Sequence, residues 1–324
     1  MAADRPQRLF TLASGGYVLL AAIVLTLAGT AWKLAPLWDA KRVRPRGGGN
    51  DPASYGFALT PSLVPQGAIV ASGMTVDALP ALTDPRTVAA SEASADRYLV
   101  PDDKVIGVVV EGEARAYPLR VLVWHEVVND VVGGTPIAVT FNPLTHGIAV
   151  FDRRVDGRTF SFGVSGLIYQ SGLVMYDKQP GGSGESLWSQ LQARAIAGPQ
   201  AAMGHALSIL PVALARWDDW SRAWSATRVL APIDGERDKY AQDVYGSYLN
   251  TDTLRFPVNP LPPPGGPGLK TPVFVDVSIT PPTVVPLQVK PGERRLEVVG
   301  PSGTRPIPGV YAFWFAWYAT RPAR

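Results

Sequence analysis

Short apolar stretches separated by turn residues dominate the chain from about residue 100 onward. Residues 105–110 are apolar and mostly β-branched, residues 113–117 alternate between polar and apolar positions, and residues 137–141 are mostly apolar. Runs of this length and composition predict β-strands rather than helices. Further strands are expected at 149–154 and 159–164, joined around Asp156 and Gly157, a pair that favours hairpin turns.

Helical patterns are fewer and shorter. Residues 91–98 could form a short helix, and residues 118–128 could form another with Pro118 in its first turn. A third helix is expected at 217–224, where two aspartates lie near the start. The pattern as a whole predicts a β-rich α+β domain.

One apolar run is long enough to cross a membrane. Residues 9–32 carry no charged side chain, and as a helix they would extend about 36 Å, more than the roughly 30 Å hydrocarbon layer. The apolar region of a cleaved signal peptide is shorter, so an uncleaved single-pass anchor is the preferred interpretation. The residues assigned to the membrane anchor are Leu9, Tyr17, Leu20, Ile23, Leu27 and Trp32.

Proline, glycine and small residues divide the chain. We expect a tail at 1–8, the anchor at 9–32, a Pro/Gly-rich tether at 33–90 and the main β-rich domain at 91–256. A second Pro/Gly-rich linker at 257–270 precedes a C-terminal β segment, residues 271–324, that packs on the main domain. Within it, residues 311–318 are predicted to form a buried strand with aromatic residues on one face, namely Tyr311, Phe313, Phe315 and Trp317.

Composition removes several classes of function. Thirty Lys and Arg against 27 Asp and Glu leave a net charge of +3, too small to predict nucleic acid as a partner. The chain has no cysteine, which excludes disulfides, thiolate metal sites and thiol nucleophiles. Hydrophobic residues make up 46% and charged residues 18%, a charge-poor balance that agrees with contact to a membrane or to other subunits. No cofactor is predicted.

A small group of polar residues could carry chemistry. His125, Glu126, Asp130 and His146 together offer two imidazoles and two carboxylates, a set that can bind a divalent metal or support acid–base catalysis. The competing interpretation is structural: His125 and Asn129 cap turns and satisfy backbone groups, as buried polar side chains usually do. The structural interpretation is preferred, so no catalytic or metal-binding residue is assigned.

Several ordered motifs resemble those of the bacterial and archaeal domain of unknown function 3179 family. The resemblance covers most of residues 96–256 and returns near the C-terminus. The segments that carry it are 102–107, 114–119, 124–130, 132–136, 151–158, 162–167, 175–177, 186–190, 197–199 and 312–317. Members of the family are typically exported or membrane-anchored, which implies the same for this chain.

One departure from the family pattern changes the functional expectation. Where the resemblance implies Cys-Pro-Leu-Cys-Gly, this chain has Asn142-Pro143-Leu144-Thr145-His146. Two thiols at this spacing could bind a soft metal or cycle as a disulfide, whereas Asn and Thr offer only neutral groups. We therefore expect this chain to have lost whatever thiol chemistry the family performs.

These observations predict a non-catalytic accessory subunit of a larger membrane complex, with other subunits and the bilayer as its partners. Energy-converting complexes are the natural candidates, with a lean towards a photosynthetic reaction-centre or antenna complex. The alternative is a periplasmic metal-binding or redox-related enzyme domain that uses His125 and His146. Basic residues after the anchor favour a cytoplasmic domain, but the family's habit of export places the domain on the periplasmic side of the inner membrane.

Overall fold

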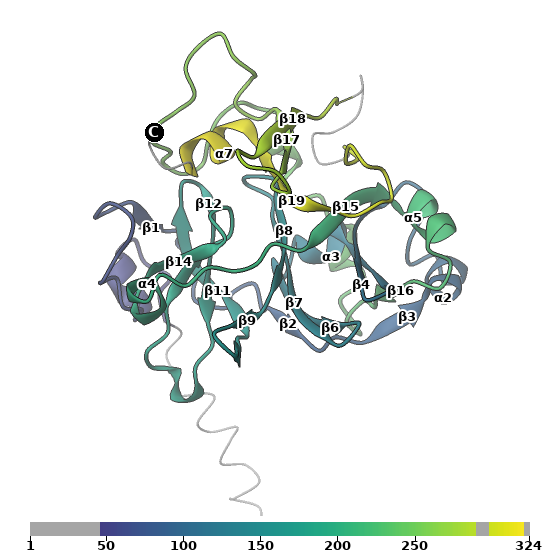
Figure 1. Cartoon of the computed structure of the whole chain (residues 1–324), viewed down its shortest axis with the longest axis horizontal. Helices are drawn as coiled ribbons and strands as arrows, with labels where there is room; N and C mark the ends of the chain where they lie inside the picture. The colour runs from purple at the N-terminus through teal and green to yellow at the C-terminus, as the bar shows by residue number, and fades with distance from the viewer. Residues whose placement is uncertain (1–45, 290–297, 321–324) are drawn as a thin grey trace, which may run out of the picture. The chain divides into compact units, whose positions relative to one another are not determined.

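The computed structural model describes residues 46–289 and 298–320. Contacts divide the chain after Pro45, so the described residues belong to one compact unit. Two β-sheets and their loops form most of this unit (Figure 1). The fold is therefore β-rich, as the sequence predicts.

The larger sheet contains twelve strands. Ten lie in the order β2-β6-β7-β8-β19-β15-β4-β5-β16-β3, and β17 extends from β19 and pairs with β18. Neighbours are antiparallel except β2 with β6 and β5 with β16. The strand bounds are β2 Leu82–Thr83, β3 Thr87–Ala89, β4 Lys104–Val110, β5 Glu113–Pro118, β6 Val127–Val132, β7 Thr135–Asn142, β8 Gly147–Asp152, β15 Pro211–Arg216, β16 Arg228–Leu230, β17 Pro272–Asp276, β18 Thr283–Pro286 and β19 Ile307–Phe313.

The smaller sheet has the order β1-β11-β12-β13-β14. Its strands are β1 Ile69–Ala71, β11 Phe162–Tyr169, β12 Gly172–Asp177, β13 Leu187–Ser189 and β14 Arg194–Ala197. A separate hairpin of β9 Arg154–Val155 and β10 Arg158–Thr159 turns at Asp156 and Gly157, which confirms the predicted turn.

The helices are short. They are α2 Ala90–Ala95, α3 Leu119–Leu122, α4 Pro199–Ala202, α5 Trp217–Ala223, α6 Gly246–Leu249 and α7 Trp314–Thr320, with 3-10 turns η2 Pro52–Tyr55, η3 Pro180–Gly182 and η4 Lys239–Ala241. In residues 46–289 and 298–320, no helix has the length and apolar character needed to span a bilayer. The predicted tail at 1–8 and anchor at 9–32 lie outside the described residues.

Close packing of large aromatic side chains explains parts of the core. Trp220 of α5 lies directly over Gly107 of β4, where any side chain would collide with the indole ring. In a second cluster, the ring of Trp188 contacts Phe160 and Phe162 at centroid distances of 5.8 and 5.5 Å. Both tryptophans are fully buried, so each contributes a large share of the apolar area that stabilises its cluster.

The helix predicted over 118–128 is wrong for most of its length. Only Leu119–Leu122 is helical, and β6 begins at Val127. The backbone of Glu126 has a φ of 54°, a left-handed conformation that cannot continue a helix. The β-branched valines that follow then pair with β7.

The strand predicted over 311–318 is also only partly correct. It ends at Phe313, and Trp314–Thr320 form α7. Phe313 pairs with Pro272, the first residue of β17, so the sheet offers no partner beyond this point. A helix satisfies the remaining backbone groups internally and still buries Phe315.

Residues 46–90 do not form the irregular tether that was expected to run from residue 33 to 90. Three short strands in this region belong to the sheets. In the smaller sheet β1 pairs with β11, and in the larger sheet β2 pairs with β6 and β3 with β16. Strands of two or three residues are too short to show a hydrophobic period, so proline and glycine dominate the local pattern. The part of the tether before residue 46 lies outside the described residues.

Candidate functional site

Two neighbouring turns carry three of the four candidate residues. The turn between α3 and β6 holds His125 and Glu126, and the turn between β7 and β8 holds His146. Because β6 and β7 are antiparallel, both turns lie at the same end of the sheet. The N–H of Phe141 donates to the carbonyl of Glu126 at 2.8 Å and ties the turns together.

Glu126 is buried at the end of a short chain of hydrogen bonds. The Asn142 amide nitrogen donates to Glu126 Oε1 at 2.9 Å. Asn142 Oδ1 in turn accepts from the Thr145 hydroxyl at 2.9 Å and from the Thr145 N–H at 3.1 Å. Burial raises the pKa of Glu126 to about 8 because the apolar surroundings disfavour the charged form. At neutral pH this side chain is therefore mostly an uncharged acid.

Glu126 and Asn142 line a cavity of about 160 Å³. Tyr245 and Arg255 close it from the segment around α6, and the guanidinium of Arg255 lies 5.5 Å from the centroid of the Tyr245 ring. Burial and the nearby Glu126 raise the pKa of Tyr245 to about 12. The cavity thus presents a neutral carboxyl, an amide and a phenol to a small polar molecule, but its volume is below that of ordinary ligand pockets.

His146 is fully buried and packs as an aromatic ring. Its imidazole stacks on Phe313 at a centroid distance of 5.4 Å and meets the edge of Phe141 at 6.4 Å. In the described part of the chain, neither ring nitrogen has a hydrogen-bond partner. Burial lowers the pKa of His146 to about 3, so the ring is neutral across the physiological range.

His125 is held by structural hydrogen bonds on both ring nitrogens. Nδ1 lies 2.8 Å from the carbonyl oxygen of Pro80, and Nε2 lies 3.0 Å from the Tyr240 hydroxyl. Burial lowers its pKa, partly offset by the hydrogen bond to Pro80 and by Glu236. Asn129 also acts structurally, since its side chain bonds the N–H and carbonyl of Phe162 at 2.8 Å each.

Asp130 belongs to a different cluster. It accepts hydrogen bonds of 2.8 Å from Arg115 Nη1 and from the Tyr117 hydroxyl, and Arg115 also pairs with Glu113. Asp130 and Arg115 are both buried, so their charges compensate each other inside the protein. Across residues 46–289 and 298–320, no three His, Asp or Glu side chains are grouped to hold a metal ion. The structure therefore does not assemble the four candidates into one centre.

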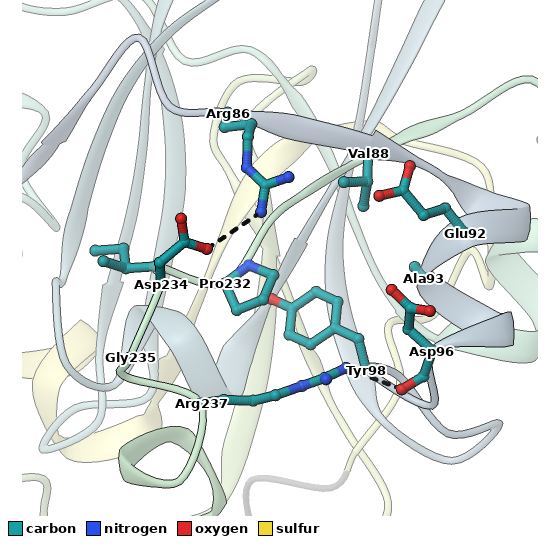
Figure 2. A pocket seen from close by; sticks show the side chains of 11 residues that line it. Arg86, Val88, Glu92, Ala93, Asp96, Tyr98, Pro232, Asp234, Gly235 and Arg237 are labelled. Carbon is teal, nitrogen blue, oxygen red and sulfur yellow. Dashed lines mark hydrogen bonds and ion pairs between the residues drawn. The ribbon is translucent and has the colours of Figure 1, made fainter.

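A second hollow, of about 200 Å³, lies between α2, β3 and the loop after β16 (Figure 2). Arg86 is 3.6 Å from Asp234, and Arg237 Nη2 donates to the carbonyl of Asp96 at 2.9 Å. Tyr98 lies between these pairs, and its hydroxyl donates to the carbonyl of Leu230 at 3.0 Å. Exposed pairs such as Arg86 and Asp234 add little stability.

Tyr245 and Arg255 are the site residues that sequence reasoning missed. They lie more than a hundred positions after Glu126 in a segment without a recognisable motif. Asn142 and Thr145 were noticed as departures from a family pattern, but their mutual hydrogen bond depends on the turn geometry. Only the fold brings Asn142, Tyr245 and Arg255 to one cavity.

Comparisons with curated proteins and with solved structures give no significant match. The family model described as Protein of unknown function (DUF3179) matches residues 76–275. This span covers more than half of the chain and includes both turns of the site. The chain therefore belongs to the DUF3179 family, as the ordered motifs of its sequence indicate.

Proposed function

We propose that this protein is a non-catalytic accessory subunit of a larger membrane complex, anchored by one helix and stabilising the assembly through its β-rich domain. The observation that carries the proposal is the hydrogen-bond chain from Thr145 through Asn142 to Glu126. It occupies the turn where the family resemblance implies two thiols.

The chemistry of this turn supports a structural role. Asn142 Oδ1 and Thr145 Oγ1 are 2.9 Å apart, so the two side chains satisfy each other's polar groups. Neither side chain can supply a thiolate, which is the ligand that soft metals require and the nucleophile of thiol exchange. A buried polar network whose members satisfy one another serves to rigidify a turn.

Other features support attachment to partners. The predicted anchor at 9–32 would hold the domain at a membrane surface. Large apolar side chains are exposed in loops of the C-terminal third, among them Leu261 at 50%, Ile279 at 53% and Val299 at 42%. Apolar side chains are found in the buried core of protein interfaces, so these residues are available for contact with other subunits. An energy-converting complex, with a lean towards a photosynthetic reaction-centre or antenna complex, remains our preferred assembly.

Extraction of the native membrane in mild detergent should show the chain in a large complex. We expect it to co-migrate on size separation with a fixed set of other subunits at constant stoichiometry, because the domain is held by both anchor and surface contacts. Mass spectrometry identifies the partners, and metal analysis of the same fraction tests the alternative. Migration as a single chain with about one bound metal ion would contradict the proposal and favour the metal-binding alternative.

We also propose that the domain lies on the periplasmic side of the inner membrane. Protease added to intact spheroplasts should then cleave the domain, because it faces the medium once the outer membrane is removed. A cytoplasmic protein measured in the same sample should stay intact and serves as the control. A domain that is cut only after lysis would place it in the cytoplasm, as the basic residues after the anchor suggest.

A further inference from the structure

A cavity of about 790 Å³, open to solvent, lies between β14, α7 and two proline-containing loops. Arg194 comes from β14, Trp317 from α7, and Pro260 and Pro281 from the loops. We call this cavity the Arg194 groove. Its volume falls within the range of about 300–1,000 Å³ that is typical of small-molecule sites.

The wall of the Arg194 groove is mostly apolar. Its apolar side chains come from segments far apart in the sequence, among them Leu63, Val64, Leu191, Pro260, Pro281 and Trp317. Such a wall gains free energy when an aliphatic chain displaces water from it.

The two glutamine side chains of the groove are already engaged. The Gln170 side-chain amide donates to the backbone carbonyl of Asn259 at 2.6 Å and accepts from its backbone N–H at 2.8 Å. The Gln192 amide donates to the carbonyl of Thr320 at 3.1 Å. These two side chains therefore position the wall of the groove.

Arg194 differs from these neighbours. Its residue is half-buried, and its Nε is inaccessible to water yet has no hydrogen-bond partner in the described part of the chain. No carboxylate of the described residues pairs with it. Arg194 lines the groove without an ion pair among the described residues, so its guanidinium can bind an anion there.

We propose that the Arg194 groove binds an amphipathic monocarboxylate, a free long-chain carboxylic acid. The carboxylate pairs with the guanidinium of Arg194, whose planar fork matches two carboxylate oxygens. The aliphatic chain lies along the apolar wall towards Trp317. Among the described residues that line the groove, Arg194 is the one cation beside a largely apolar wall, which favours a ligand with one negative charge at one end.

A photoreactive hexadecanoate bearing a diazirine on its chain tests this binding site. The full-length protein in phosphatidylcholine nanodiscs is labelled, and the modified peptides are mapped by mass spectrometry. We expect labelling on peptides from the groove wall, such as those containing Leu191 or Trp317. Unlabelled hexadecanoate should compete, whereas the alcohol of the same chain length should compete about tenfold less because it lacks the charge.

Substitutions at Arg194 distinguish the contribution of its charge to binding from the contribution of the apolar wall. Arg194→Gln should reduce labelling of the groove about tenfold, and Arg194→Lys should reduce it less, since the charge remains and the fork is lost. The matched control is Arg154→Gln, which removes an exposed arginine paired with Asp152 and should leave labelling unchanged. Equal labelling of the Arg194→Gln variant, equal competition by the alcohol, or labelling only outside the groove would each overturn the proposal.

Discussion

The free energy of unfolding should be nearly constant between about pH 4.5 and 6.5 and should fall at lower and at higher pH. The loss at higher pH comes from Glu126, whose pKa rises from 4.5 to about 8 on folding. Above pH 4.5 the unfolded chain releases this proton while the folded protein retains it, so stability falls as the pH approaches 8. The full difference corresponds to about 4–5 kcal/mol of unfolding free energy.

The loss at lower pH comes partly from His146 and partly from carboxyl groups whose pKa is lowered on folding, such as Glu113 and Asp152. The pKa of His146 falls from 6.5 to about 3 on folding, so below pH 6.5 the unfolded chain takes up a proton that the folded protein cannot accept. Between pH 4.5 and 6.5 a rise in pH lowers the unfolding free energy through Glu126 and raises it through His146. The two effects are of similar size because each involves one proton. The nearly constant free energy of unfolding in this range follows from this cancellation.

Two substitutions identify the groups responsible. Glu126→Gln keeps the oxygen that accepts from Asn142 but cannot ionise, so the variant should be several kcal/mol more stable than the parent at pH 9. His146→Asn tolerates the left-handed backbone at this position, where φ is 50°, and should reduce the loss below pH 4.5.

Urea titrations at each pH measure these effects, followed by tryptophan fluorescence of the full-length protein. The control is Glu92→Gln on α2. The Glu92 side chain is exposed, so removing its charge should leave the pH dependence of the unfolding free energy unchanged. An unchanged loss of stability above pH 6.5 in Glu126→Gln would show that this carboxyl is not the group that titrates.

Replacement of Arg115 by methionine should destabilise the protein by about 3–5 kcal/mol. Arg115 and Asp130 are 2.8 Å apart, with only 9% and 7% of their side chains exposed. Removing the guanidinium leaves the Asp130 carboxylate buried with the Tyr117 hydroxyl as its remaining side-chain donor. The free energy lost is mainly that of an uncompensated buried charge, which water can no longer solvate.

The matched control for this substitution is Arg154→Met. Arg154 also pairs with an aspartate, Asp152, at 2.6 Å, but its side chain is 54% exposed. Exposed pairs contribute at most about 1 kcal/mol, so the midpoint of urea unfolding should move little. A similar small change in both variants would contradict the role assigned to the buried pair.

Local patterns predicted much of the sheet structure because strand and turn signals act over a few residues. The strand at 105–110 and the turn at Asp156 and Gly157 depend on β-branched side chains and on a dipeptide with a strong turn preference. The helix at 217–224 was also correct within one residue. The ordered motifs identified the family, since they span most of the matched region.

The candidate site was less predictable, although its residues were nearly all named. His125, Glu126, Asp130 and His146 are close in sequence, and proximity suggested one centre. In the fold Asp130 pairs with Arg115, His125 with Pro80 and Tyr240, and His146 with two phenylalanine rings. Each partner lies on another element, so sequence spacing could not reveal it.

By itself, the sequence determined the β-rich class of the domain, its principal turns, its family and the absence of cysteine chemistry, because these depend on residue type and on short-range order. The tertiary structure decided which strands pair, where β19 gives way to α7, and how polar groups are distributed between satisfied networks and open cavities. Those outcomes depend on partners far along the chain. Arg194 shows the difference: as a residue it is one arginine among many, and only the fold places it in a largely apolar groove with no carboxylate of the described residues paired to it.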